Sequence, residues 1–218
     1  SLDNFEASHR KAAAAAAAAR QHFQTLALQL RRQRLQAGDG LSEALHHELQ
    51  GLRMPKCRFS VAVEEVPESQ AGPHGLDAVT FWVQTNPGLP AAPVHRAASG
   101  GELSRLMLAL RVVLNQAHPV LVFDEIDSGA GGAVAAAIGA RLAALGEKAQ
   151  VLAITHSPQV AASGAAHWKI AKRVEGERAR TDVARLEGAA RQEEIARMLA
   201  GETIGEEARA AAARLLKD

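Results

Sequence analysis

The sequence has few of the residues that mark several common protein classes. Its single cysteine, Cys57, rules out an internal disulfide, and its nine histidines form no cluster with the spacing of a structural zinc site. The longest apolar run, residues 12–19, is weakly hydrophobic alanine between Lys11 and Arg20. It is too short to span a bilayer and wrongly flanked for a signal peptide. We therefore expect a soluble, cytoplasmic protein without a membrane partner.

The sequence also lacks an excess of charge of either sign, since its net charge is +1. Such a balance gives no global attraction to nucleic acid, and the densest basic run, residues 31–34, is typical of a solvated helix face. With 218 residues, 47% of them hydrophobic, the chain is long enough for one sizeable core or a core plus an appendage. The first residue is Ser1 rather than methionine, and it opens a helical segment, which indicates a piece of a longer protein.

The N-terminal segment is predicted to be helical. Residues 2–36 contain no proline or glycine and favour one long helix, which the Ala-Gly-Asp-Gly at residues 37–40 is expected to end. A second helix is predicted over residues 42–54, with Leu45, Leu49 and Leu52 on one face. We expect the two helices to pack as an antiparallel pair, a helical hairpin that resembles the base of a coiled-coil arm. Two ordinary surface helices are the alternative.

The rest of the chain, residues 55–218, is predicted to form a second domain of class α/β. Two strands, residues 58–64 and 77–85, precede an irregular linker. After the linker, helices alternate with short apolar strands, which favours a mainly parallel sheet covered on both faces. The predicted elements are helix 101–115, strand 120–123, helix 130–145, strand 150–155, a helix from Pro158, a hairpin of residues 166–172 and 180–187 at the sheet edge, and helices 191–200 and 206–217.

Ser99 and Glu102 fit the capping box that opens many helices, and apolar residues at helical spacing follow them. The capping box does not explain Gly100 and Gly101, because glycine in a first helical turn lowers helix stability. Two glycines there allow the backbone to approach a ligand closely, and helix N-termini attract anions. A phosphate contact is therefore a candidate role for this turn.

Asp124 and Glu125 end the apolar strand Val-Leu-Val-Phe, at the position where open α/β sheets bind ligands. Asp124 could hold Mg²⁺ through water, and Glu125 could orient and deprotonate an attacking water. The alternative is that both are helix-capping acids in a solvated loop.

His156 ends the next apolar strand and precedes Ser157 and Pro158, a typical helix start. It is expected at the same sheet edge as Glu125, where it could donate to a terminal phosphate, although a structural role is the common one for a lone histidine in a turn. A dinucleotide-binding interpretation of residues 129–134 is discounted, because Val134 occupies the third glycine position.

The order of these motifs is more specific than any one of them. Residues 99–105 (SGGELSR), 124–132 (DEIDSGAGG) and 155–161 (THSPQVA), with a closing EEIARMLAG, resemble the C-terminal lobe of an ABC-type ATPase head, and within that superfamily the RecN family of SMC-like proteins of DNA double-strand-break repair. The resemblance implies that Ser99, Gly100, Gly101 and Glu102 form the signature motif, which contacts the γ-phosphate of ATP on an opposing head. It implies a Walker B pair of Asp124 and catalytic Glu125, a D-loop at Asp127 that helps to align the heads, and a switch histidine at His156.

The sequence contains no phosphate-binding GxxxxGK[ST] motif. The resemblance therefore implies three partners: an N-terminal P-loop lobe of the same protein, a second head in an ATP-dependent homodimer, and DNA. It implies ATP and Mg²⁺ as cofactors, a nucleoid-associated location, and a chain that is inactive alone. The alternatives are a head lobe of another SMC-like, Rad50-like or ABC ATPase, and a non-catalytic dimerisation module.

Overall fold

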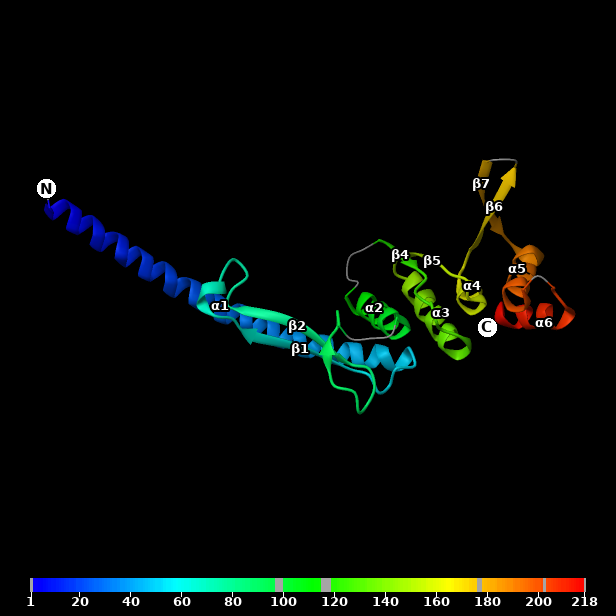
Figure 1. Cartoon of the computed structure of the whole chain (residues 1–218), viewed down its shortest axis with the longest axis horizontal. Coiled ribbons are helices and arrows are strands. Elements are labelled where there is room, and N and C mark those ends of the chain that lie inside the picture. Colours follow the sequence, from blue (N-terminus) through cyan, green and yellow to red (C-terminus); the bar gives the residue numbers. More distant parts are fainter. Residues whose placement is uncertain (1, 97–99, 115–118, 176–177, 202, 218) are drawn as a thin grey trace. The chain divides into compact units, whose positions relative to one another are not determined.

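The structure is a computed structural model that describes residues 2–96, 100–114, 119–175, 178–201 and 203–217. Its helices and strands follow one another as α1 (Leu2–Gly51), β1 (Arg58–Glu65), η1 (Glu68–Gln70), β2 (Asp77–Gln84), β3 (Ala92–Pro93), α2 (Gly100–Leu114), β4 (Val120–Asp124), α3 (Gly132–Gly146), β5 (Gln150–Ile154), α4 (Pro158–Ser163), β6 (His167–Glu175), β7 (Arg178–Leu186), α5 (Gly188–Ala200) and α6 (Glu206–Leu215) (Figure 1). The contacts divide the chain into a first unit, Ser1–His46 with Lys56–Ala97, and a second unit, His47–Pro55 with Ala98–Asp218.

The first unit is built from α1 and an antiparallel ribbon of β1 and β2 that runs beside it (Figure 1). The short strand β3 adds to β2, with Trp82 opposite Pro93. A glycine allows the helix to approach the ribbon closely, because a Cβ added at Gly38 would lie 3.0 Å from the Cβ of Val61. The rings of Phe59 and Phe81 lie 5.5 Å apart, centroid to centroid, across the two strands.

The predicted helical hairpin is wrong, because α1 continues without a break from Leu2 to Gly51. A glycine inside a helix is about 1 kcal/mol less favourable than an alanine. The two glycines in residues 37–40 therefore resemble the end of a helix. Packing overrides that local preference here, since the glycine at position 38 makes room for Val61. The units also depart from the predicted division at residue 54, because Lys56–Ala97 cluster with Ser1–His46.

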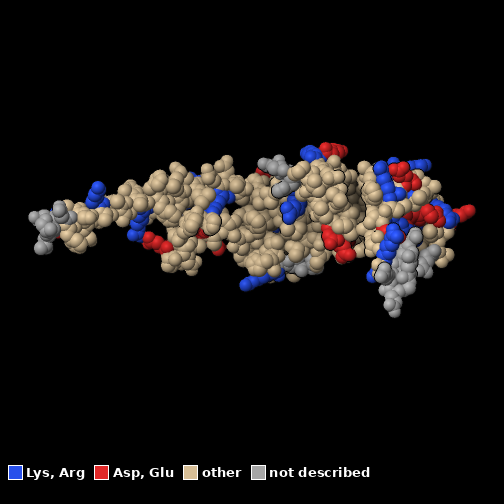
Figure 2. All heavy atoms as spheres, turned by 90° about the horizontal axis from the view of Figure 1, so that it is seen from above, with Lys and Arg blue, Asp and Glu red and all other residues tan. Residues whose placement is uncertain are grey.

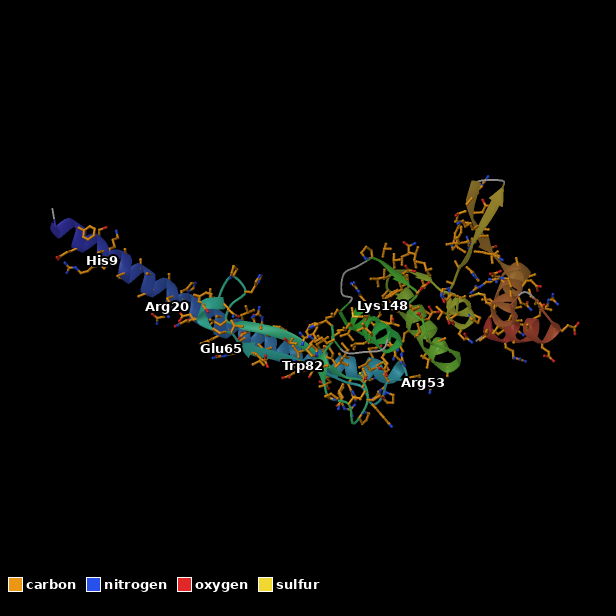
Figure 3. The ribbon with its side chains drawn as sticks, viewed as in Figure 1. His9, Arg20, Arg53, Glu65, Trp82 and Lys148 are labelled. Atoms are coloured by element: carbon orange, nitrogen blue, oxygen red, sulfur yellow. The ribbon has the colours of Figure 1, made fainter. Side chains whose placement is uncertain are left out.

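Two arginines of the basic run of α1 pair with acids and are only partly exposed, whereas Arg32 between them is exposed. Arg31 Nε donates to Oδ1 of Asp77 at 2.7 Å, and Arg31 Nη1 lies 3.0 Å from Oε2 of Glu65. Arg34 Nη1 lies 3.8 Å from the second oxygen of Asp77, whose side chain is fully buried. The hydrogen bond with Asp77 is the largest of the effects that raise the pKa of Arg31. Further along α1, Arg20 pairs with Glu68; Arg20 and Glu65 are labelled in Figure 3.

The second unit contains the predicted parallel strands. Strands β4 and β5 pair in parallel from Val120 opposite Gln150 to Asp124 opposite Ile154, and α3 packs against β5 and α4. The sequence analysis expects helices on both faces of this sheet, but the described residues cover only one face of β4 and β5. One face is buried at Leu121 and Phe123, whereas the side chains of the other face are exposed: Val120, Val122, Leu152 and Ile154.

The hairpin of β6 and β7 forms as predicted, but the described residues place it in a sheet of its own and not at the edge of β4 and β5. An ion-pair cluster links it to α5, since buried Glu194 pairs with Lys169 of β6 and with Arg197. Burial acts to raise the pKa of Glu194 and is the largest single effect. The hydrogen bonds from Arg197 and Lys169 together outweigh it, and they leave that pKa lowered.

The helices α5 and α6 close the second unit around Ile195, Ala196 and Ala212. Arg191 of α5 donates to the backbone oxygens of Ala161, Ala162 and Gly164 and so caps the end of α4.

The surface mixes charges of both signs, and Figure 2 shows lysine and arginine interspersed with aspartate and glutamate on the face that it draws. None of the described helices combines the length and the apolar character that a membrane crossing requires.

Candidate functional site

The carboxyl ends of β4 and β5 bring together the acids and the histidine that the sequence singled out. Because Asp124 pairs with Ile154 in the parallel register, the residues that follow each strand leave the sheet at the same edge. The expected proximity is confirmed, since Nε2 of His156 lies 3.6 Å from Oε1 of Glu125. Both side chains are largely exposed, His156 at 73% and Glu125 at 56%, so each is accessible to a ligand.

The backbone at Glu125 is strained. Its φ is +49°, in the left-handed region that L-residues other than glycine rarely adopt. Two hydrogen bonds hold this conformation: Glu125 N donates to Ile154 O at 3.0 Å, and Ser128 N donates to Glu125 O at 2.9 Å. Such strain costs about 1–3 kcal/mol and is concentrated at functional sites. A helix-capping acid in a solvated loop would not require it.

Asp124 is an exposed carboxylate at the last position of β4. Among the described residues no group of three or more histidine, cysteine or acidic side chains could enclose a metal ion. Mg²⁺ is usually held by one or two carboxylates, with waters and substrate phosphates as its other ligands. A lone exposed aspartate at a strand end therefore fits Mg²⁺ bound together with a nucleotide, and does not fit a structural metal site.

The N-terminus of α2 packs directly on the turn after β4. A Cβ added at Gly101 would lie 3.3 Å from the backbone oxygen of Ser128, which is a tight contact, so this glycine has a packing role that the sequence did not reveal. Arg105 holds the same turn of α2, since Nε donates to Gly101 O at 3.1 Å and Nη1 to Leu52 O at 3.3 Å. Gly100 is exposed and Glu102 half-buried. Ser99 lies outside the described residues, and so does its expected capping box.

Asp127 is placed differently from the exposed acids. Its side chain is buried, with 4% of the residue exposed, and its Oδ2 accepts a hydrogen bond from Oγ1 of Thr155. Thr155 Oγ1 in turn accepts a hydrogen bond from Ser157 N at 2.8 Å. The sequence analysis named Asp127 but missed Thr155. The available signal was a hydroxyl residue between an apolar strand and His156.

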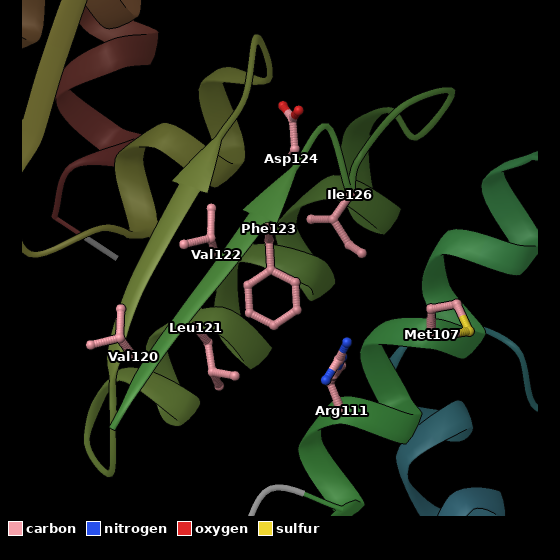
Figure 4. A pocket seen from close by; sticks show the side chains of 8 residues that line it. All are labelled: Met107, Arg111, Val120, Leu121, Val122, Phe123, Asp124 and Ile126. Atoms are coloured by element: carbon pink, nitrogen blue, oxygen red, sulfur yellow. The ribbon is translucent and has the colours of Figure 1, made fainter. Parts of the chain in front are cut away.

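A hollow of about 430 Å³ lies between α2 and β4 (Figure 4). Arg111 and Met107 of α2 face it from one side, and Phe123 faces it from β4. The apolar residues at helical spacing predict a buried amphipathic helix, and in α2 Leu106 and Leu110 are buried whereas Met107 and Leu114 are exposed.

A second hollow of about 350 Å³ adjoins the strand ends. It is lined by the turn after β4, the turn after β5, and Met198 and Leu199 of α5. The end of the sheet thus combines an acid pair, a histidine, a glycine-rich helix start and open space in which a ligand can be held.

Solved structures with a similar arrangement are SMC heads. One comes from a study of ATP-driven dimerization and DNA-stimulated activation of SMC ATPases; it has a TM-score of 0.54, 14% identity, and a match covering 79% of this chain and 99% of that one. Another is the Smc head domain with a coiled coil and joint from Pyrococcus yayanosii, with a TM-score of 0.53 and 14% identity over 72% of this chain and 28% of that one. At these identities the likeness concerns the fold.

No family model matches the chain. Among curated proteins, it is 44% identical to the DNA repair protein RecN of Rickettsia bellii over 185 residues, which cover 84% of this chain and 33% of that protein. It is 41% identical to RecN of Xylella fastidiosa over 187 residues, and 39% identical to RecN of Vibrio cholerae over 198 residues. These matches cover 85% and 90% of this chain but 34% and 36% of those proteins. The chain therefore belongs to the RecN family and spans about a third of the length of these relatives.

Proposed function

We propose that this chain is the C-terminal lobe of an ABC-type ATPase head, in a RecN protein that acts in DNA double-strand-break repair. The observation that carries the proposal is the meeting of Glu125 and His156 at the ends of two parallel strands, with the backbone of Glu125 held at a φ of +49°. Strain of this kind is retained where a side chain must be aimed at a reacting group. The similarity to RecN relatives supports the same assignment.

Glu125 acts as the general base of the proposed hydrolysis. Its exposed carboxylate lies beyond the strand end, where it can orient a water molecule and accept its proton. His156, at 3.6 Å, faces the same space and donates to a terminal phosphate oxygen. Asp124 would hold Mg²⁺ through water, and the bound ion would supply positive charge beside the phosphates of the nucleotide.

The start of α2 serves a second nucleotide. By motif, Ser99, Gly100, Gly101 and Glu102 contact the γ-phosphate of ATP carried by an opposing head, in an ATP-dependent homodimer. Free backbone amides at a helix N-terminus support this role, since they attract phosphate. Ser99 lies outside the described residues, so its part depends on the motif alone. Asp127 belongs to the D-loop between the two nucleotides.

An N-terminal lobe of the same protein supplies the P-loop. Two features support this partner: the printed sequence has no GxxxxGK[ST], and the strand pair presents an exposed apolar face that another part of the head can cover. The exposed residues 5–22 of α1 belong to the base of the coiled-coil arm. DNA as a partner, and a cytoplasmic, nucleoid-associated location, follow from the family.

The test is Mg-dependent ATP hydrolysis by this chain alone and after mixing with a separately produced N-terminal lobe. We expect activity only in the mixture, and a loss of at least about 100-fold with Glu125→Gln while ATP binding is retained. Ser99→Arg is expected to abolish hydrolysis, because it blocks the contact with the opposing head.

Glu147→Gln is the matched control, because it makes the same chemical change at an exposed residue after α3 and is expected to leave hydrolysis unchanged. Appreciable hydrolysis by the chain alone would contradict the split site. A folded mixture that binds ATP but does not hydrolyse it would instead favour a non-catalytic dimerisation module.

A further inference from the structure

In the second unit, Asp127 is one of two buried charged residues among those the structure describes; the other is Glu194. The two differ in their partners. Glu194, at 8% exposure, is held by the cations Lys169 and Arg197. Asp127 meets only the neutral hydroxyl of Thr155, and its Oδ1 has no hydrogen-bond partner among the described residues. Burying a carboxylate with so little compensation is unfavourable for stability.

The position of this hydrogen bond indicates what it is for. Asp127 comes two residues after Glu125, and Thr155 comes one residue before His156. The bond therefore joins the two turns whose side chains meet at the proposed catalytic site. Thr155 Oγ1 also accepts the Ser157 amide at 2.8 Å, so the carboxylate fixes the backbone on both sides of His156.

The remaining contacts of the turn after β4 fix Asp127 in place. Ala130 N donates to Asp127 O at 2.9 Å, which closes a tight turn. Gly101 of α2 packs against the backbone oxygen of Ser128, the residue that follows Asp127. The backbone and the side chain of Asp127 are therefore both held in this turn.

We propose that Asp127 is a positioning residue: through Thr155 it holds His156 at the distance from Glu125 that hydrolysis requires. This inference rests on the proposed ATPase function. It assigns to the D-loop aspartate a role inside one head, distinct from the alignment of two heads. Thr155, to which the motif of residues 155–161 gave no role, becomes part of the same arrangement.

The main test is Thr155→Val in the full-length protein, because valine keeps the shape of threonine and removes the hydroxyl. We expect kcat for ATP hydrolysis to fall about 10- to 100-fold with KM changed less than about threefold, since a small misplacement of catalytic groups has effects of this size. Thr155→Ser restores the hydroxyl and is expected to retain most of kcat. Unchanged kcat in Thr155→Val, or an equal loss in Thr155→Ser, would overturn the proposal.

Asp127→Ala tests the other end of the bond, and Glu194→Gln is its matched control. Both variants remove a buried negative charge, but Glu194 lies on α5 in the ion-pair cluster. We expect Glu194→Gln to lower the melting temperature and leave kcat within about twofold. If the two variants lost kcat in equal proportion, the role of Asp127 would be structural only.

A readout that needs no nucleotide separates this inference from the proposed function. Hydrogen exchange at the Ser157 amide should become at least about 10-fold faster in Thr155→Val, because its acceptor is lost. If Glu125→Gln has no effect on hydrolysis, the ATPase proposal fails whatever Thr155 does. If Glu125→Gln abolishes hydrolysis and Thr155→Val leaves kcat and Ser157 exchange unchanged, only the positioning role fails.

Discussion

The two units use their charged side chains in opposite ways. In the first unit, the side chain of Asp77 is fully buried, its Oδ1 accepts a hydrogen bond from Arg31, and Arg34 lies 3.8 Å from its Oδ2, so the charges stabilise the packing of α1 on the ribbon. In the second unit, Glu125 and His156 are exposed at the strand ends, and the backbone of Glu125 is held at a φ of +49°. The paired charges around Asp77 contribute to the stability of the fold. The exposed side chains of Glu125 and His156 are instead available to a ligand.

The chain contains one tryptophan in each unit, Trp82 in β2 and Trp168 in β6, which allows the units to be followed separately. Replacing either one by phenylalanine leaves a fluorescence signal from the other unit. The predictions below use these two backgrounds.

Asp77→Ala is expected to have the largest effect on stability. It removes the common partner of Arg31 and Arg34 and leaves Arg31 with its ion pair to Glu65, so the free energy of unfolding should fall. Urea unfolding followed by Trp82, in the Trp168→Phe background, should show the loss. Glu68→Ala removes the exposed pair with Arg20 and should cost less than about 0.5 kcal/mol. Similar costs for the two variants would erase the contrast between the units.

Ile138→Ala is the corresponding change in the second unit. Ile138 of α3 is fully buried, and truncation at such a site costs about 2–4 kcal/mol through lost burial and a cavity. We expect the transition of Trp168, in the Trp82→Phe background, to move to lower urea. Leu114→Ala, at the exposed end of α2, is the control and should cost less than about 0.5 kcal/mol. A loss seen first at Trp82 would contradict the division into units.

Glu125→Gly separates stability from function at a single residue. Glycine adopts a φ of +49° without strain, so the free energy of unfolding should stay equal or rise by up to about 1 kcal/mol while hydrolysis is lost. Glu147→Gly, where φ is −70°, should lower it by about 0.5–1 kcal/mol. A clear destabilisation by Glu125→Gly would show that its backbone is not strained.

The pH dependence of stability should give the smallest effect, and it distinguishes His167 from Glu194. Burial is the main cause that lowers the pKa of His167 below 6.5, helped by Arg191 and Lys169 and opposed by Glu194. The unfolded chain therefore binds more protons there, and stability should fall as pH drops below about 6.5. Because the pKa of Glu194 is lowered, its contribution is lost only below about pH 4.5. In urea titrations at several pH values, His167→Gln should reduce the fall in the free energy of unfolding between about pH 6.5 and pH 4.5. An unchanged dependence on pH in this range would contradict the prediction.

Much of the fold of the second unit could be predicted because its elements are local patterns. Short apolar runs and helix-start signals identified β4, α3, β5 and α4 in the correct order, and the parallel pairing of β4 with β5 is confirmed. The cover of the strand pair could not be predicted, because an apolar run does not reveal which residues pack on it.

Long-range packing explains what the sequence missed in both units. Gly38 resembled a helix end but lies against Val61, more than twenty residues away. The sequence analysis interpreted Gly101 as a residue that allows a phosphate to approach the backbone closely. The structure shows that it also packs on Ser128. The burial of Asp127 depends on Thr155, which is 28 residues distant. Contacts between residues so far apart leave no periodic pattern in the sequence, so they can be seen only in the structure.

The open face of β4 and β5 has a practical consequence for solubility. Val120, Val122, Leu152 and Ile154 expose branched apolar side chains on a short strand pair, a pattern that favours self-association between copies. During synthesis, this surface would need cover soon after it folds. Co-expression with the proposed N-terminal lobe is therefore the sounder way to produce the protein, and concentration-dependent turbidity is the hazard to watch for when this chain is made by itself.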